Sequence, residues 1–141
     1  KMSEKFKILT QFVKDMSSET PNVETYLYVK EYLKNYNLNI DITTKPLKGR
    51  MIEVNTKLNY IDKGKTKNKS HFEITYASII EIDEQIKDRK IIEKIILCDV
   101  QKEIYPNLEK VFINLLSNSG FPGIKFEKKV DFEQLYNQRL N

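Results

Sequence analysis

The sequence predicts one α+β domain over residues 1–141, in which antiparallel strands come first and later helices cover one face of the sheet. Three observations predict this class. Apolar residues alternate with polar ones in the first half and recur at helical spacing in the second half. The length of 141 residues fits a single domain.

Four stretches of the first half alternate apolar and polar side chains: Phe6 to Met16, Leu38 to Ile42, Ile52 to Tyr60 and Phe72 to Ile82. Such alternation predicts strands with one buried face and one wetter face. The segments 45–49 and 62–69 contain the residues typical of turns. Connections this short favour antiparallel neighbours.

The segment 22–37 between the first two strands is ambiguous. Tyr28, Tyr32 and Tyr36 are spaced by four, which favours a helical turn. The preference of tyrosine for strands favours the opposite. We expect an irregular connection that includes a short strand.

The second half has the pattern of a long helix. Apolar residues keep helical spacing from about Arg89 to Leu116, and Pro106 breaks or restarts the helix. Gly120 suits the position just after the C-terminus of this helix, and Pro122 stops any continuation.

A last short helix is predicted near the end of the chain. Asp131 and Gln134 resemble a capping box, and the apolar residues Leu135, Tyr136 and Leu140 follow it. Because the helices follow the strands in the sequence, we expect both of them to lie on the same face of the sheet.

Composition restricts the classes of function. The net charge is +4, but lysine greatly outnumbers arginine, so we attribute the charge to composition rather than to phosphate binding. The basic run from Lys63 to Lys69 is predicted to be a hairpin tip that lysine keeps soluble. One cysteine suits a reducing cytoplasm. No apolar run reaches the roughly 18 residues of a membrane span, so we expect no direct membrane insertion.

No group of residues suggests catalysis. His71 is the only histidine, and a zinc site needs at least about three ligands, which one histidine and one cysteine cannot supply. Cys98 lies in an apolar helical stretch without an activating base. The glycines form no phosphate-binding loop. We therefore expect a protein that is not an enzyme and has no metal or cofactor.

Two clusters are candidates for surface contacts. Asp15 and Glu19 share a face of the first strand if it stays regular, as do Glu73 and Glu81 on the fourth. These carboxylates suit a solvated face or a docking patch for a basic partner. The tyrosines of segment 22–37 suit core packing or, if exposed, an apolar groove for many chain sequences.

The ends of the chain carry the most specific motifs. The first strand ends in Phe-Val-Lys-Asp-Met-Ser-Ser-Glu-Thr-Pro (residues 12–21), and the C-terminal part contains Gly-Phe-Pro (120–122) and Val-Asp-Phe-Glu-Gln-Leu-Tyr (130–136). These motifs resemble those of the SecB family of bacterial protein-export chaperones. The pair Pro106-Asn107 is similar to the family's Cys-Pro-Asn, with Tyr105 in place of the cysteine.

The resemblance implies a four-stranded antiparallel sheet with a long and a short C-terminal helix on one face. It implies that two chains pair and that two pairs stack, giving a homotetramer that is a dimer of dimers. It also implies an ATP-independent cytoplasmic holdase, which keeps secretory preproteins unfolded and delivers them to the SecA motor ATPase.

The resemblance assigns residues to three sites. The contacts for the basic, zinc-bearing tail of SecA are expected at Asp15, Glu19, Glu73 and His71, although His71 stands where the family has leucine. The positions that affect tetramer formation are expected at Phe72, Ile74 and Tyr76. The preprotein groove is expected to include Tyr26, Tyr28, Tyr32 and Tyr36.

Departures from the family leave two alternatives open. The stretch from Asp83 to Lys94 is longer than usual, which predicts an extended fourth strand or long helix, and the chain is basic where the family is usually acidic. One alternative is a SecB-like chaperone dedicated to an antitoxin. The other is a basic module whose tyrosines stack single-stranded nucleic acid, although the scarcity of arginine leads us to expect no nucleic-acid partner.

Overall fold

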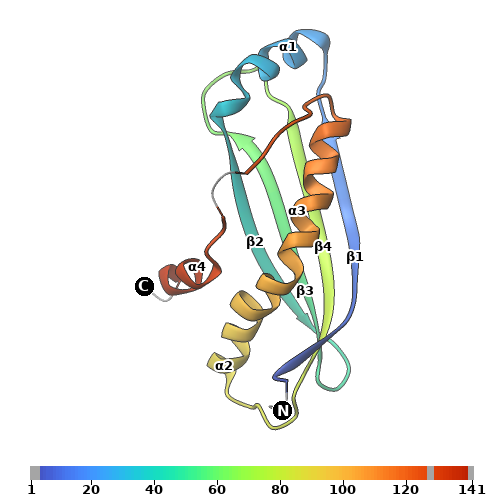
Figure 1. The fold of residues 1–141 in the computed structure, drawn as a ribbon, viewed down its shortest axis with the longest axis vertical. Helices are drawn as coiled ribbons and strands as arrows, with labels where there is room; N and C mark the ends of the chain where they lie inside the picture. Colours follow the sequence, from blue (N-terminus) through green and yellow to red (C-terminus); the bar gives the residue numbers. More distant parts are fainter. Residues whose placement is uncertain (1–3, 127–128, 140–141) are drawn as a thin grey trace.

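The computed structural model describes residues 4–126 and 129–139. A four-stranded antiparallel sheet has the order β1-β4-β3-β2, and the helices after β4 lie along one of its faces (Figure 1). The strands are β1 (Phe6–Glu19), β2 (Tyr36–Pro46), β3 (Met51–Asp62) and β4 (His71–Ile82). The predicted α+β class and the antiparallel sheet are confirmed, and each alternating stretch lies within one strand.

Strand β1 does not keep the simple alternation that its sequence predicts. Its pairing with β4 shifts register between Ile8 and Thr10 and again between Val13 and Asp15. Each shift is a bulge that inserts one residue and moves the following side chains to the other face. Ile8 therefore pairs with Ile80 on the helix side, whereas Phe12 lies on the outer face.

The expectation of an irregular connection with a short strand over residues 22–37 is wrong. The segment forms helix α1 (Val23–Tyr32) and the short 3₁₀ helix η1 (Leu33–Asn35). Asn22 caps the helix, because its Oδ1 accepts a hydrogen bond from the backbone N–H of Thr25 at 2.8 Å. Thr25 and Val29 are buried, so packing of one helical face overrides the strand preference of tyrosine.

The long helical run begins at Arg89, as predicted, but its middle is not a regular α-helix. Helix α2 (Arg89–Lys94) continues into a π-helical segment, η2 (Ile95–Val100), and then into α3 (Gln101–Asn118), which contains Pro106. Strand β4 ends at Ile82, residues 83–88 form a connection and α2 begins at Arg89, so the long stretch does not extend the strand.

Helix α3 ends next to α1. Gly120 follows with φ +99°, a conformation that favours glycine, and a Cβ there would lie 2.7 Å from the Tyr26 ring. The hydroxyl of Tyr26 donates to the carbonyl oxygen of Gly120 at 2.8 Å. Gly120 therefore acts both as the predicted end of the helix and as the contact between α3 and α1.

The last helix, α4 (Phe132–Arg139), begins where the capping pattern predicts. The backbone N–H of Gln134 donates to Asp131 Oδ1 at 3.0 Å. Leu140 lies outside the described residues. Phe132 is buried, and its ring packs edge-on against Tyr105 of α3, with 5.3 Å between the ring centroids.

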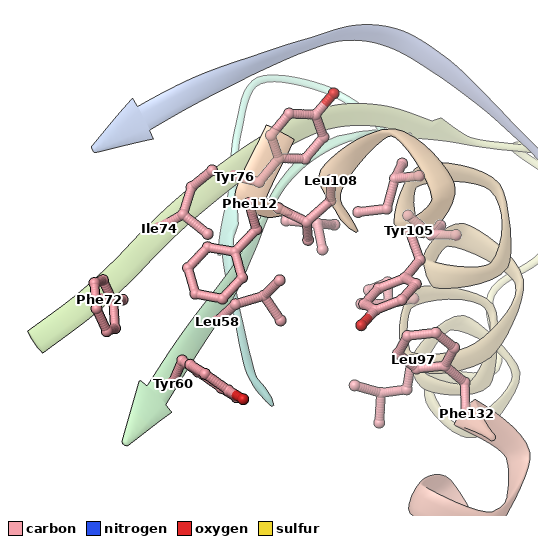
Figure 2. Close-up of a cluster of buried hydrophobic side chains, with 14 of the residues drawn as sticks. Leu58, Tyr60, Phe72, Ile74, Tyr76, Leu97, Tyr105, Leu108, Phe112 and Phe132 are labelled. Carbon is pink, nitrogen blue, oxygen red and sulfur yellow. The ribbon is translucent and has the colours of Figure 1, made fainter. Parts of the chain in front are cut away.

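The core lies between the sheet and the helical run, as Figure 2 shows for its largest members. The helix-side residues of β3 and β4, among them Leu58 and Ile74, pack against Leu108 and Phe112 of α3. One face of each central strand is thus buried, as the alternation predicts. No helix within residues 4–126 and 129–139 is long and apolar enough to cross a membrane.

Candidate functional site

An open groove lies between the edge strand β2 and the helices that pass it. Its larger part has a volume of about 700 Å³. The wall from the sheet is Ile42, Thr43, Thr44, Pro46 and Ile52, and the wall from the helices is Arg89, Ile92, Glu93, Ile96, Leu97 and Arg139. The lining therefore mixes apolar side chains with hydroxyl and charged ones.

A smaller hollow of about 180 Å³ continues the groove toward α4. It is lined by Ile40, Asp41, Ile42, Leu97, Phe132, Leu135, Tyr136 and Arg139. Ile42, Leu97 and Arg139 line both parts, so the two hollows form one surface. We call the residues that line the two parts the β2–α4 groove.

The backbone of β2 adds a second element of recognition. β2 is the last strand of the sheet, so within the described chain only its β3 side is hydrogen-bonded to a neighbour. Figure 1 shows α4 beside this strand. An edge strand offers unpaired N–H and C=O groups to an extended peptide, while an apolar wall accepts its side chains. The groove is suited to a peptide of variable sequence.

The floor of the groove is held by the π-helical segment. Ile95 to Cys98 are four consecutive buried residues, because the sheet lies on one side of η2 and α4 on the other. Gln101 follows η2 and is fully buried; its Oε1 accepts from Thr56 Oγ1 at 2.9 Å, and its Nε2 donates to the carbonyl of Ile96 at 3.3 Å. This side chain fixes η2 on β3.

Cys98 attaches α4 to the same segment. Its thiol donates to the carbonyl oxygen of Phe132 at 3.7 Å. Burial raises the pKa of this thiol, and the nearby carboxylates of Glu133 and Asp99 raise it further. Because the thiolate is the reactive form, the raised pKa agrees with an inert packing role for Cys98.

The predicted acidic residues lie together on the outer face of the sheet. Glu19 pairs with His71, and Glu73 follows two residues later on the same face of β4. Asp15 lies on this face of β1 as well. Glu73 Oε1 is 3.2 Å from Nζ of Lys57 and 4.0 Å from Nε2 of His71. The cluster is therefore mixed in charge rather than purely acidic.

A second ion pair lies on the outer face beyond this cluster. The Nζ of Lys14 contacts the carboxylate of Glu53, and this hydrogen bond lowers the pKa of Glu53, helped by a second one from Asn55. Lysine side chains thus compensate part of the negative charge of the outer face.

The four predicted groove tyrosines do not form one surface. Tyr26 packs against Phe121 at 5.2 Å between ring centroids, and Tyr36 is buried near Tyr60. Only Tyr28 and Tyr32 pack on each other near the surface, at 4.6 Å. None of the four tyrosines lines the β2–α4 groove, whose members the sequence did not indicate because β2, α2 and α4 are far apart in the chain.

Phe72, Ile74 and Tyr76 lie inside the single chain. Their side chains are buried on the helix-facing side of the sheet (Figure 2). The Tyr76 hydroxyl donates to Gln11 Oε1 at 2.9 Å and accepts from Asn107 Nδ2 at 2.6 Å, so it connects β1 to the Pro106-Asn107 turn of α3. Any effect of these residues on association is expected to act through the shape of the sheet and helix.

The described residues contain no cluster of three or more histidine, cysteine or acidic side chains placed to hold a metal ion. The arrangement provides a groove, a mixed-charge face and an open strand edge. Each of these is suited to binding a polypeptide.

Known proteins resemble this chain over nearly its full length. The family model described as preprotein translocase subunit SecB matches residues 1–141. A putative protein-export protein SecB of Pelagibacter ubique is 56% identical over 140 residues and covers 99% of this chain and 100% of the relative. A protein-export protein SecB of Parvibaculum lavamentivorans is 27% identical over 136 residues, which are 94% of this chain and 77% of the relative.

A solved structure shares the fold. It is the SecB-like chaperone Rv1957 of Mycobacterium tuberculosis in complex with a ChAD peptide from the HigA1 antitoxin, with a TM-score of 0.64 and 9% sequence identity. The match covers 89% of this chain and 91% of that one. At this identity the likeness concerns the fold alone. The family model matches the whole chain, and both relatives described above are SecB protein-export proteins. The chain therefore belongs to the SecB family of protein-export chaperones.

Proposed function

We propose that this chain is an ATP-independent holdase that keeps secretory preproteins unfolded in the cytoplasm and delivers them to the SecA motor. The β2–α4 groove is the observation that carries the proposal. It combines apolar side chains, set among polar ones, with an unpaired strand edge, and both bind extended chains without a requirement for one sequence. No catalytic residue is needed for such a role.

Weak contacts suffice at each groove. A client segment that buries about 300 Å² of apolar surface gains on the order of 7 kcal/mol before its ordering costs are subtracted. A folded client hides its apolar side chains and gains nothing. The chaperone therefore competes with folding by mass action and binds the unfolded state.

Strand β1 supports the proposal that copies of the chain pair. It forms the other edge of the sheet, and Leu9, Phe12, Val13 and Met16 are exposed along it. Helix α3 covers the middle of the sheet and leaves β1 open in Figure 1. A second β1 would cover these side chains and continue the sheet, and two such pairs would give the proposed homotetramer.

Assembly would increase affinity without new chemistry. A long preprotein that crosses several grooves binds each further groove at a high effective concentration. The cluster of Asp15, Glu19, His71 and Glu73 would lie on the outer face and is proposed to bind the basic tail of SecA. Lys57 beside Glu73 would weaken that attraction.

Export is favoured over the two alternatives. The hypothesis of a chaperone dedicated to an antitoxin is supported by the shared fold alone, whereas the relatives that match by sequence are named for protein export. The hypothesis that the chain binds single-stranded nucleic acid requires a platform of aromatic side chains on which bases can stack. The tyrosines of residues 26–36 are instead divided between the core and the surface.

The proposal predicts a delay in refolding. A slow-folding secretory precursor diluted from denaturant into an excess of the purified chain should regain its native fluorescence several-fold more slowly than in buffer, because the holdase sequesters the unfolded state. Addition of ATP should leave the delay unchanged, and an unrelated soluble protein at the same concentration should cause none. An unchanged refolding rate at excess chaperone would contradict the proposal.

The pairing of β1 makes a second prediction. Phe12→Lys combined with Met16→Lys places two charges on the proposed interface, so the tetramer should break into smaller species in sedimentation velocity at micromolar concentration. Leu27→Lys, on exposed α1, serves as the control and should leave the tetramer intact. A double variant that still sediments as a tetramer would exclude β1 from the interface.

A further inference from the structure

One end of the molecule joins two segments that are far apart in the sequence. At this end of the sheet, Glu19 pairs with His71 and Tyr36 pairs with Asp62. The segment 20–35, which carries α1, connects the two edge strands at this end, and the loop 63–70 connects the two central strands between them. Figure 1 shows the loop beside α1. Ser70 fixes the arrangement: its Oγ is 2.7 Å from Thr20 Oγ1, and its N–H donates to the Tyr36 hydroxyl at 3.0 Å.

Lysine is concentrated at this end. The two segments 20–35 and 62–70 carry six lysines against three carboxylates. The lysines are Lys30, Lys34, Lys63, Lys65, Lys67 and Lys69. Of the three carboxylates, Asp62 is buried, and its Oδ1 accepts from the N–H of Gly64 at 2.8 Å. The exposed surface at this end therefore carries more net positive charge than the count of six lysines against three carboxylates indicates.

Apolar side chains are exposed beside these lysines. Val23 is 68% exposed and Leu27 is 59% exposed, and both lie on one stripe of α1 that continues into Lys30 and Lys34. The opposite side of α1 is held by buried Thr25 and Val29, so the stripe cannot turn inward. We call Val23, Leu27 and the six lysines the basic pole.

We propose that the basic pole adsorbs to anionic lipid surfaces. Exposed lysines in a loop are suited to a diffuse layer of negative headgroups, and exposed apolar residues beside them can enter the headgroup region. The lysines attract the surface from a distance, and Val23 and Leu27 add contact once it is reached. This is peripheral adsorption, and it requires neither a client in the β2–α4 groove nor a membrane span.

The same features fit nucleic acid less well. Phosphates gain nothing from exposed Val23 and Leu27, and the two segments contain no arginine. The rings of Tyr28 and Tyr32 pack on each other at 4.6 Å, so they are already engaged and not open to sandwich bases. The observations therefore favour a lipid surface.

Vesicle co-sedimentation tests the proposal with the full chain. At about 0.1 M salt, we expect binding to vesicles of equal phosphatidylglycerol and phosphatidylcholine, and little binding to phosphatidylcholine alone. The variant K63Q/K65Q/K67Q/K69Q should lose at least about tenfold in partition coefficient, since each lysine near an anionic surface contributes roughly fivefold. Leu27→Asn, which leaves the charge unchanged, should lose several-fold.

A matched variant separates the basic pole from net charge. K48Q/K87Q/K90Q/K94Q removes the same charge from exposed positions at the opposite end of the sheet and should retain most of the binding. Circular dichroism checks that all variants are folded. Equal loss in both quadruple variants, absence of binding to anionic vesicles at low salt, or tighter binding of a single-stranded RNA oligonucleotide through the same four lysines would each overturn the proposal.

Discussion

Replacing Phe72 with alanine is expected to lower the free energy of unfolding by about 3–5 kcal/mol. Phe72 is fully buried, and its ring lies 5.6 Å from that of Phe121, 6.2 Å from Tyr36 and 6.4 Å from Tyr60 (Figure 2). Four aromatic rings meet here from β2, β3, β4 and the segment after α3. Loss of the central ring leaves a cavity that these neighbours cannot fill.

This experiment separates a core role from an interface role. If Phe72 acted only in association, Phe72→Ala would yield a folded monomer whose urea unfolding, followed by circular dichroism, is close to that of the dissociated parent. If the ring supports the core, the unfolding midpoint falls at every protein concentration. Tyr32→Ala, which removes a ring from exposed α1, is the control and should cost less than about 1 kcal/mol.

The sheet was predictable because its central strands have a simple environment. β3 and β4 have a strand on each side and helices on one face. The apolar residues that alternate along them are therefore the residues that are buried under the helices. β1 is an edge strand, and its bulges have no signature in the local sequence. Asp15 and Glu19 could be placed on one face of β1 since the stretch between them is regular, and the pairing of β1 with β4 brings Glu73 onto the same face.

Helix α1 was missed although its start was visible in the sequence. Pro21-Asn22 is a good entry to a helix, and Asn22 does cap it. The strand preference of tyrosine was given more weight, but burial of Thr25 and Val29 decides the structure. The π-helical segment had no signal either, because the run Ile95 to Cys98 suits a buried α-helix equally well.

The groove could not have been predicted from the sequence. Ile42, Ile92 and Leu135 belong to three elements that meet only in space, and each one alone looks like ordinary core or surface. The resemblance pointed to the segment after Pro21 instead. It carried over the position of a tyrosine cluster without the orientation of the four side chains: α1 turns Tyr26, Tyr28 and Tyr32 in different directions, and Tyr36 lies in β2.

Placing charges in the β2–α4 groove is expected to remove client binding. Ile92→Asp and Leu135→Asp change one residue from each part of the groove. Both side chains reach solvent, so the fold should tolerate the change, but a bound apolar segment would have to desolvate two carboxylates. The double variant should bind an unfolded precursor at least about tenfold more weakly in fluorescence anisotropy, and it should no longer delay refolding.

The controls for this variant decide between two client sites. Leu27→Asp introduces the same carboxylate at a more exposed position outside the groove and should bind the precursor normally. Tyr28→Asp with Tyr32→Asp charges the remaining surface pair of tyrosines. Because the β2–α4 groove has both an apolar wall and an open strand edge, we expect the tyrosine variant to retain most of its affinity. Loss in the tyrosine variant with full binding in the groove variant would instead place the client on α1.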